Sequence, residues 1–421
     1  MTFPKSGSYL AHTLSLNTGN DETISIEFSN EGVVVTWFQI QSFIEAVNSI
    51  GSITTPEPLI ARTPKGWITL NDGKLQKSSI STAGYSEVKF QYRRAVEAGL
   101  NEKDYSEVNG LASRIDGLAE WAEMWPTETS IEYEQNRLRS ISIRSENLPT
   151  KHLQGELNPH LETYFLHKPA GYDEISSISG ALIYKTHSEP RESWESHEGS
   201  HQMMADLMTL AHGRACRFTI ISAWRKDDEV LRNGETVQHW KDAFAPSERR
   251  EEAPVEVTSS NTSPLFHLKE VNSDKLGNWL CSRSPWRRAL NIAVSTYFSN
   301  NLTSEMKYIN VAIALEALGF SIGKERGTSN KQLKTFNDQV SQIVNLVGEP
   351  TVSLITKSST PEQWIIEAGN AYNGLKHANR KVTDWRVADE KAEEGLTLIR
   401  AWAAIELGVD ADLVNERLKS H

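Results

Sequence analysis

The chain has 421 residues, 24% of them charged and 38% hydrophobic, which is the composition of an ordinary globular protein. Its 44 Lys and Arg against 55 Asp and Glu give a net charge of −11, which excludes a protein that binds duplex nucleic acid through basic charge over its whole surface. Two cysteines, Cys216 and Cys281, are too few for a disulfide scaffold. The N-terminus lacks a signal-peptide pattern and no apolar run is long enough to span a bilayer, so we expect a cytoplasmic protein that does not contact a membrane.

Charge is unevenly distributed along the chain. Residues 283–421 contain 17 basic and 16 acidic residues, a net charge of +1, so residues 1–282 carry a net charge of −12. A polyanion is attracted to the less acidic part of a protein. We therefore expect any contact with a polyanion in the last third of the chain.

Residues 1–245 predict a mostly antiparallel β domain. Short segments rich in β-branched and aromatic residues, several of them alternating in period two, are separated by polar turns. They are Thr23–Phe28, Val33–Trp37, Gly66–Leu70, Glu87–Tyr92, Ile131–Tyr133, Ile141–Ile143, Ile178–Tyr184 and Phe218–Trp224. Two helices are predicted between them, one from the spacing of Leu111, Ile115, Leu118 and Trp121, the other over Met203–Ala211. Many short strands with few helices favour a β domain over this part of the chain.

The rest of the chain predicts a linker and then a helical bundle. Residues 246–282 are the linker, because Pro246–Pro264 is rich in Pro, Ser and Glu and is followed only by a strand-like run at Leu265–Val271. Residues 283–421 carry helical patterns with recognisable ends. These are Trp286–Phe298, a helix from Thr303 that closes between Gly319 and Gly327, Leu333–Val347, a helix from Thr360, Val387–Leu407, and a short helix after Asp410. The predicted fold class is α+β, with the β domain preceding an all-α bundle.

The helix that starts at Thr360 contains the sequence NAYNGLKHANR. Helical spacing places Asn373 and His377 one turn apart on one face, with Arg380 three residues further along. Gly374 lies on the same face, and because glycine costs a helix interior about 1 kcal/mol, it predicts close approach of a backbone or a ligand. Imidazole moves protons near neutral pH, and a neighbouring cation stabilises a phosphorane-like transition state. Asn373, His377 and Arg380 are therefore the predicted catalytic residues; the alternative is a solvated helix face without a function.

These residues carry a resemblance to a known family. The C-terminal bundle resembles a HEPN domain of the ApeA-like type, and the N-terminal region is similar to the ApeA-type β domain. The segments concerned are Ile313–Leu318 (IALEAL) and Tyr372–Arg380 (YNGLKHANR) in the bundle, and Gly66–Leu70 (GWITL), Gly117–Trp121 (GLAEW) and Trp194–Arg214 (WESHEGSHQMMADLMTLAHGR) before it.

The resemblance implies a metal-independent ribonuclease of anti-phage defence or toxin type. Such domains dimerise and bring two Arg-x4–6-His motifs into one composite site, where a ribose 2′-hydroxyl attacks the adjacent phosphate. His377 corresponds to the motif histidine and Asn373 to the polar residue after the motif arginine. Tyr372 stands where that arginine belongs, so Arg380 is the expected substitute, with Lys376 and Lys381 as RNA-binding residues. No metal or other cofactor is expected.

The function predicted from this resemblance is RNA cleavage in abortive infection, regulated by the N-terminal domain. The expected partners are RNA, with tRNA as one candidate, a phage-derived trigger, and a second copy of the chain. Two alternatives stay open. In one, the bundle is non-catalytic and mediates only dimerisation, interaction or sensing.

The second alternative is a zinc hydrolase. His197-Glu-Gly-Ser-His201 matches H-E-x-x-H, in which two histidines bind zinc from one helix face and the glutamate activates water, with His212 as a conceivable third ligand. Gly-Ser at the centre is poor helix material for a rigid metal site. The competing interpretation, which we prefer, is the N-terminal part of a helix that leads into an apolar stripe, with no metal bound.

Overall fold

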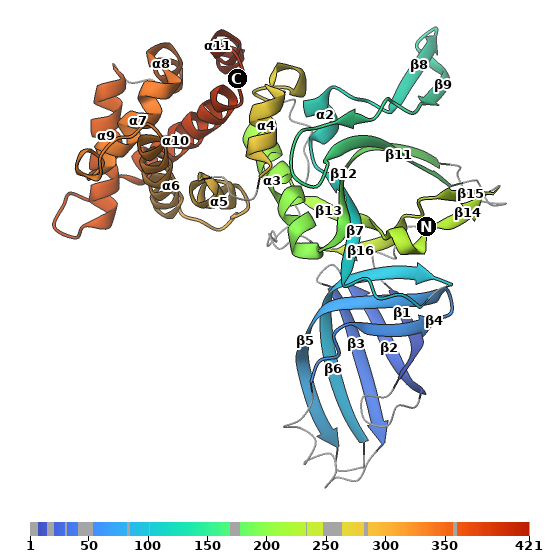
Figure 1. The fold of residues 1–421 in the computed structure, drawn as a ribbon. Coiled ribbons are helices and arrows are strands. Elements are labelled where there is room, and N and C mark those ends of the chain that lie inside the picture. The colour runs from blue at the N-terminus through green and yellow to red at the C-terminus, as the bar shows by residue number, and fades with distance from the viewer. Residues whose placement is uncertain are drawn as a thin grey trace. The chain divides into compact units, whose positions relative to one another are not determined.

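A computed structural model describes most of the chain and divides it into two compact units. One unit combines Met1–Arg114, Tyr184–Glu198 and Thr219–Glu248, and the other combines Ile115–Ile183, Gly199–Phe218 and Arg249–His421. An antiparallel β region precedes a helical one along the chain, which confirms the predicted α+β class (Figure 1). The described residues are 7–14, 21–29, 32–40, 54–81, 85–100, 102–168, 177–232, 234–246, 263–281, 285–356 and 360–420.

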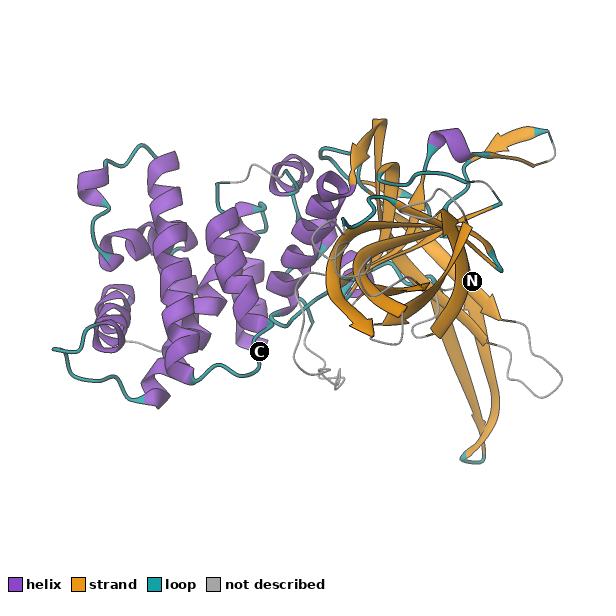
Figure 2. Ribbon diagram, turned by 90° about the horizontal axis from the view of Figure 1, so that it is seen from below, coloured by secondary structure: helices purple, strands orange, loops and turns teal. Residues whose placement is uncertain are grey.

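The first six strands close into a barrel in the first unit. Their order is β6-β3-β2-β1-β4-β5, and an additional antiparallel pairing of β5 with β6 joins the two ends (strands are orange in Figure 2). Alternate side chains fill the interior, where the rings of Trp37 and Phe90 meet edge to face at 6.5 Å. The strands are β1 (Gly7–Leu14), β2 (Asp21–Ser29), β3 (Gly32–Ile40), β4 (Leu59–Thr63), β5 (Gly66–Ser81) and β6 (Tyr85–Gly99).

Further strands extend the sheet from β6. The order continues as β16, β13, β7 and β12, and β16 pairs antiparallel with β6. The additional elements here are β7 (Glu107–Ile115), β12 (Ser177–Ser193), β13 (Phe218–Trp224) and β16 (Lys241–Ala245), with the small pair β14 (Val230–Arg232) and β15 (Glu235–Val237) and the 3-10 turn η2 (Lys226–Asp228). Every strand segment predicted within residues 1–245 lies within one of the observed strands.

The helix predicted from Leu111 to Trp121 is wrong in its first half. Residues 107–115 form β7, and the helix α2 covers only Leu118–Ala122. All side chains of β7 from position 108 to position 113 are buried. A strand that is buried on both faces shows no period-two alternation, so its apolar residues matched a helical spacing by chance.

The second unit begins with smaller β elements and two helices. Strand β10 (Lys151–His152) pairs with β11 (His160–Lys168), and β8 (Thr127–Glu134) with β9 (Arg137–Ser145) as a separate hairpin. Helix α3 (Trp194–His212) contains the second predicted helix, Met203–Ala211, and its residues are divided between the two units.

The predicted linker is only partly described, since residues 247–262 lie outside the described residues. The strand expected at Leu265–Val271 is wrong, because the 3-10 turn η3 (Leu268–Glu270) stands there instead. His267 and Glu270 close this turn through a reciprocal capping box, while Leu265 and Phe266 are buried. Helix α4 (Ser273–Trp279) follows, capped by the side chain of Asn272.

The C-terminal helices form a bundle around α6 (helices are purple in Figure 2). Each predicted helix is present, and α8 was not predicted because it starts directly after the left-handed Gly348 that ends α7. Gly319 does not end α6; it lets the backbone of Gln339 approach, since a Cβ there would lie 2.0 Å from that carbonyl oxygen. The helices are α5 (Arg287–Tyr297), α6 (Ser304–Glu325), α7 (Phe336–Val347) with η4 (Asn330–Gln332) before it, α8 (Glu349–Thr356), α9 (Pro361–Lys376), α10 (Trp385–Glu406) and α11 (Ala411–Ser420).

Two arginines of the bundle bind partners outside it but within the second unit. Arg400 of α10 donates from Nε to the carbonyl of Leu210 at 2.8 Å and from Nη2 to that of Ala211 at 3.2 Å. These are orphan carbonyls at the end of α3. Arg417 of α11 pairs with the Glu270 carboxylate through Nη1 and Nη2. A fragment that starts at residue 283 would therefore lose the hydrogen-bond partners of Arg400 and Arg417.

One helix meets the length and composition of a membrane span. Among the residues that the structure describes, only α6 does so, with a mean hydropathy of 1.2 over the window tested. Half of that window is buried inside the protein, as in the core helix of a bundle. The core helix of a bundle meets the same criteria, so α6 is weak evidence for a membrane span.

Candidate functional site

Helix α9 begins where the sequence predicts. The Thr360 hydroxyl accepts a hydrogen bond from the amide of Gln363 at 3.2 Å, and Pro361 occupies the first helical position. Further along, the Tyr308 hydroxyl donates to the carbonyl of Ala368 at 2.7 Å. These contacts anchor one face of α9 in the bundle and leave its other face to solvent.

The end of α9 differs from the prediction. The helix stops at Lys376, and His377 is its C-cap in extended conformation, with φ −121° and ψ 116°. The amide of His377 still donates a hydrogen bond to the carbonyl of Asn373 at 3.1 Å. Arg380 lies in a turn that is closed by the hydrogen bond from its own amide to the His377 carbonyl, at 3.0 Å. The prediction that His377 and Arg380 continue the helical face of Asn373 is therefore wrong.

The chain folds back over the last turn of α9, which explains this early end. The Thr383 hydroxyl donates to the carbonyl of Ala371 at 2.8 Å. A Cβ on Gly374 would lie 2.5 Å from that hydroxyl and 2.6 Å from the carbonyl oxygen of Lys381. Gly374 thus permits close backbone approach, as its position predicts, and the returning segment occupies the space that a longer helix would need.

The predicted site residues gather in one exposed segment. Asn373, Lys376, His377, Arg380 and Lys381 are all exposed at the end of α9 and in the loop 377–384. Lys376 places its ammonium 5.0 Å from the ring centre of Tyr372, whereas no hydrogen bond or ion pair of the other four side chains occurs among the described residues. The segment ends at Trp385, which is 53% exposed and whose ring contacts the Arg386 guanidinium at 4.9 Å. The exposed cations Lys376, Arg380 and Lys381 suit a polyanion.

Tyr372, which stands where the resemblance to HEPN domains leads us to expect arginine, is buried. Its hydroxyl donates to Glu316 Oε2 at 3.1 Å, and its ring packs against Phe336 at 5.4 Å. Burial, reinforced by the charge of Glu316 and the hydrogen bond to it, raises the pKa of Tyr372 to about 12. Tyr372 is therefore a neutral hydrogen-bond donor near neutral pH and supplies neither a cation nor a base.

The HEGSH segment lies in α3, in the helix that the preferred interpretation requires. His197 is fully buried, with Nδ1 2.8 Å from the Thr186 hydroxyl and Nε2 3.2 Å from the Ser188 hydroxyl. Burial lowers the pKa of His197 to about 4. His201 is also fully buried, with its ring 6.1 Å from that of Phe218. Both ring nitrogens of His197 are engaged, so this histidine is not poised as a metal ligand.

Glu198, the residue that would activate water in a zinc site, belongs to an ion cluster instead. Arg94 reaches it from β6 with Nη2 at 2.8 Å from Oε2, and Arg93 binds the same oxygen. Arg94 also pairs with Glu195 at 2.6 Å. Burial lowers the pKa of Arg94, but its bonds to Glu198 and Glu195 outweigh this and hold the pKa above its usual value. The cluster is structural.

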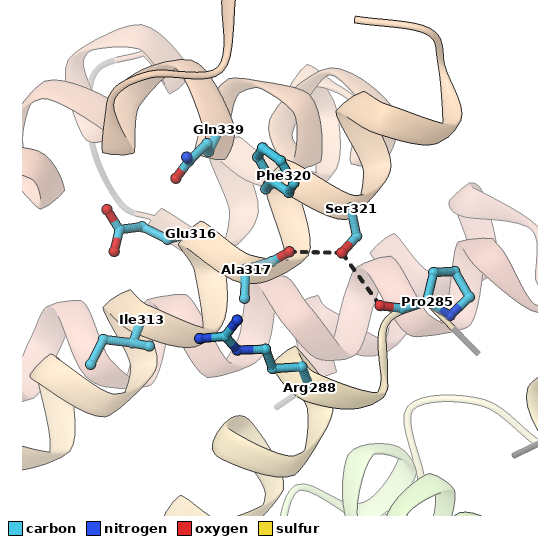
Figure 3. Close-up of a pocket in the computed structure, with 8 residues that line it drawn as sticks. All are labelled: Pro285, Arg288, Ile313, Glu316, Ala317, Phe320, Ser321 and Gln339. Atoms are coloured by element: carbon cyan, nitrogen blue, oxygen red, sulfur yellow. Dashed lines mark hydrogen bonds between the residues drawn. The ribbon is translucent and has the colours of Figure 1, made fainter. Parts of the chain in front are cut away.

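A pocket opens on the bundle next to Tyr372. It has a volume of about 390 Å³ and lies between α5, α6 and α7 (Figure 3). The Ser321 hydroxyl is held by the carbonyls of Ala317 at 3.0 Å and Pro285 at 3.4 Å. Glu316, which accepts the Tyr372 hydroxyl bond, also lines the pocket. The lining residues are Pro285, Arg288, Ile313, Glu316, Ala317, Phe320, Ser321 and Gln339.

This pocket was not predicted from the sequence. Its one available signal was Glu316, the single charged residue in the apolar run Val311–Phe320. A carboxyl group in such a run is expected to have a specific partner. Arg288 and Gln339 come from other helices, and only tertiary packing brings them to it.

A family model described as ApeA N-terminal domain 1 matches residues 11–279, which is more than half of the chain. The match covers the strands, α3 and α4 and ends before α5. No curated protein and no solved structure matches the chain. The chain belongs to the ApeA N-terminal domain 1 family.

Proposed function

We propose that this protein acts in anti-phage defence and cuts RNA without a metal ion at the end of α9. The family membership supports the defence role. One observation carries the cleavage: His377 and Arg380 are exposed, are joined by a backbone turn, and among the described residues their side chains have no other partner. Such groups are available to a phosphate, unlike the buried histidines of α3.

In the proposed reaction, a neutral His377 takes the proton from a ribose 2′-hydroxyl while that oxygen attacks the adjacent phosphorus. The bond to the 5′-oxygen breaks, and the leaving oxygen takes a proton from the protonated His377 of the partner subunit. The products are a 2′,3′-cyclic phosphate and a 5′-hydroxyl. Arg380 stabilises the charge on the non-bridging oxygens, Asn373 positions the phosphate, and Lys376 and Lys381 bind the flanking RNA.

A homodimer through the bundle is part of this proposal. A single histidine cannot act as base and acid at once on opposite sides of the phosphorus, whereas two copies related by a two-fold axis supply both groups. Light scattering on the purified full chain is expected to give the mass of a dimer at micromolar concentration. A monomer at that concentration would contradict the composite site.

The N-terminal region is the proposed regulator, and a phage-derived molecule the proposed trigger, in the cytoplasm. In the predicted division, the sensor domain comprises residues 1–245, the linker residues 246–282 and the RNA-cleaving bundle residues 283–421. The net charge of −12 over residues 1–282 supports a region that competes with RNA for the cationic loop. Cleavage of tRNA or another cellular RNA would then stop growth of the infected cell, as in abortive infection.

The decisive experiment compares the full wild-type chain with His377→Ala, both with a chelator present. Sequencing of RNA ends after expression is expected to reveal new 5′-hydroxyl ends in the wild type, and loss of the base is expected to lower the rate roughly 10²–10⁴-fold. His152→Ala is the matched control, because His152 is also exposed but lies on β10. Equal cleavage by all three proteins would contradict the proposed site.

The buried Tyr372 favours a second candidate, a non-catalytic HEPN domain that only binds RNA or mediates dimerisation. The motif position carries a neutral hydroxyl bonded to Glu316 in place of a cation. In this case wild type and His377→Ala would both leave RNA intact, while Lys376→Gln with Lys381→Gln would weaken RNA binding. The zinc hydrolase has no such support, since His197 and Glu198 are engaged by hydroxyls and arginines.

A further inference from the structure

The pocket between α5, α6 and α7 contains polar groups that lack partners. Gln339 donates from Nε2 to the carbonyl of Leu333 at 3.0 Å, but its Oε1 is buried without a hydrogen-bond partner among the described residues. Glu316 uses Oε2 for the Tyr372 hydroxyl and forms no other hydrogen bond within the described part of the chain. A buried acceptor without a donor is costly, so this side of the pocket is suited to a ligand that donates hydrogen bonds.

The other side of the pocket offers a cation. Arg288 extends from α5 towards Ile313 and Ala317, while Glu316 and Gln339 are drawn on the other side of Ala317 (Figure 3). Arg288 is exposed and forms no ion pair with any residue that the structure describes. Its planar guanidinium can donate two parallel hydrogen bonds to a ligand with paired acceptors.

The walls between these groups are apolar and partly aromatic. Phe320 is 39% exposed and lines the pocket together with Ala317 and Ile313. A ring at this position can stack on a flat heterocycle. The volume of about 390 Å³ is at the small end for ligand pockets, so it suits one base with its sugar and not a longer segment of RNA.

We propose that this pocket binds guanine, as a nucleotide or as one base of an RNA. Guanine presents adjacent N–H donors at N1 and N2 on one edge, which match the carboxylate of Glu316 with the Gln339 oxygen, and acceptors at O6 and N7 on the next edge, which match Arg288. Adenine offers one amino donor beside a ring acceptor and cannot satisfy the same arrangement. The inference does not depend on RNA cleavage, because binding is measured without it.

Calorimetric titration of the full chain with guanosine monophosphate tests the proposal. Inosine monophosphate lacks the N2 amino group and 7-deazaguanosine monophosphate lacks N7, so each is expected to bind about tenfold more weakly, and adenosine monophosphate more weakly still. Equal affinity for the guanine and adenine nucleotides, or no heat with any of them at millimolar concentration, would overturn the proposal.

Substitutions of Glu316 and Arg288 test whether these side chains cause the preference for guanine. Glu316→Gln keeps an acceptor for Tyr372 but loses the carboxylate, so the preference for guanine over adenine is expected to fall about tenfold. Arg288→Gln is expected to lose the discrimination against 7-deazaguanine. Arg326→Gln, at the C-cap of α6 and outside the pocket, is the control and is expected to bind as wild type. An unchanged preference in folded Glu316→Gln would overturn the assignment. Failure of binding leaves the His377 cleavage test unaffected, and the reverse also holds.

Discussion

Two helices of this protein carry a histidine in a sequence pattern typical of catalytic sites, and the two histidines differ in their exposure to solvent. On α3 the sequence H-E-x-x-H is complete, yet His197 is fully buried between two hydroxyls and Glu198 is bound by two arginines. On α9 the arginine of the motif is missing, yet His377 is exposed at the helix end. A chemical role needs a group that can reach substrate, so the incomplete motif is the better candidate.

The strongest test of this comparison is Arg380→Ala. If Arg380 replaces the missing motif arginine, its loss removes stabilisation of the transition-state charge and is expected to lower the rate of RNA cleavage roughly 10²–10³-fold, nearly as much as His377→Ala. Arg386→Ala is the control, because that guanidinium lies against the ring of Trp385. Full activity of Arg380→Ala beside an inactive His377→Ala would show that another group stabilises the charge.

On α3 the matching change is expected to affect stability and not chemistry. Glu198→Ala leaves the buried Arg94 with the exposed Glu195 as its one ion-pair partner among the described residues, and the free energy of unfolding is expected to fall by about 3 kcal/mol. Urea denaturation measures this change. Glu195→Ala, whose side chain is 67% exposed, is expected to cost less than about 1 kcal/mol. Loss of catalysis in Glu198→Ala without loss of stability would restore the hydrolase interpretation of α3.

A smaller effect is expected where the loop returns over α9. Gly374→Ala places a Cβ within 2.6 Å of the Lys381 carbonyl, so the loop carrying Arg380 has to move. We expect a cost of about 1–3 kcal/mol from overpacking, measured by urea denaturation, and weaker RNA binding. Gly199→Ala, where the added Cβ meets nothing within 4 Å, is the control on α3 and is expected to be neutral or stabilising. Wild-type RNA binding by Gly374→Ala would separate the loop from the site.

The sequence predicts the elements of this fold better than their ends and contacts. The strands around Val33–Trp37 and Phe218–Trp224 and the cap at Thr360 follow from local patterns, and the structure confirms them. The strand β7 was not predicted because burial on both faces removes its periodicity.

The end of α9 and the pocket could not be predicted for a related reason. The Thr383 hydroxyl donates to the carbonyl of Ala371, twelve residues earlier in the chain, and this contact between loop and helix has no local signature. Arg288, Glu316 and Gln339 stand on three different helices, so their common pocket exists only after packing. The sequence therefore predicts the candidate residues, but it places His377 and Arg380 on a helix that ends before them.

The last prediction concerns the pH dependence of the free energy of unfolding that the buried His197 causes. Burial holds the pKa of His197 at about 4 in the folded protein, against an ordinary value of about 6.5 in the unfolded chain. Between these values the unfolded state binds a proton that the folded state does not, so the free energy of unfolding rises with pH here and falls as pH drops from about 6.5 towards about 4. His197 alone contributes a slope approaching about 1.4 kcal/mol per pH unit in this window and none well above pH 7. His212, whose pKa burial also lowers, adds in the same direction. Urea denaturation between pH 7.5 and pH 5 measures the slope, which is expected to be shallower in His197→Gln than in wild type. The same slope in His197→Gln as in wild type would mean that other groups cause the acid sensitivity and that His197 is not held neutral by its burial.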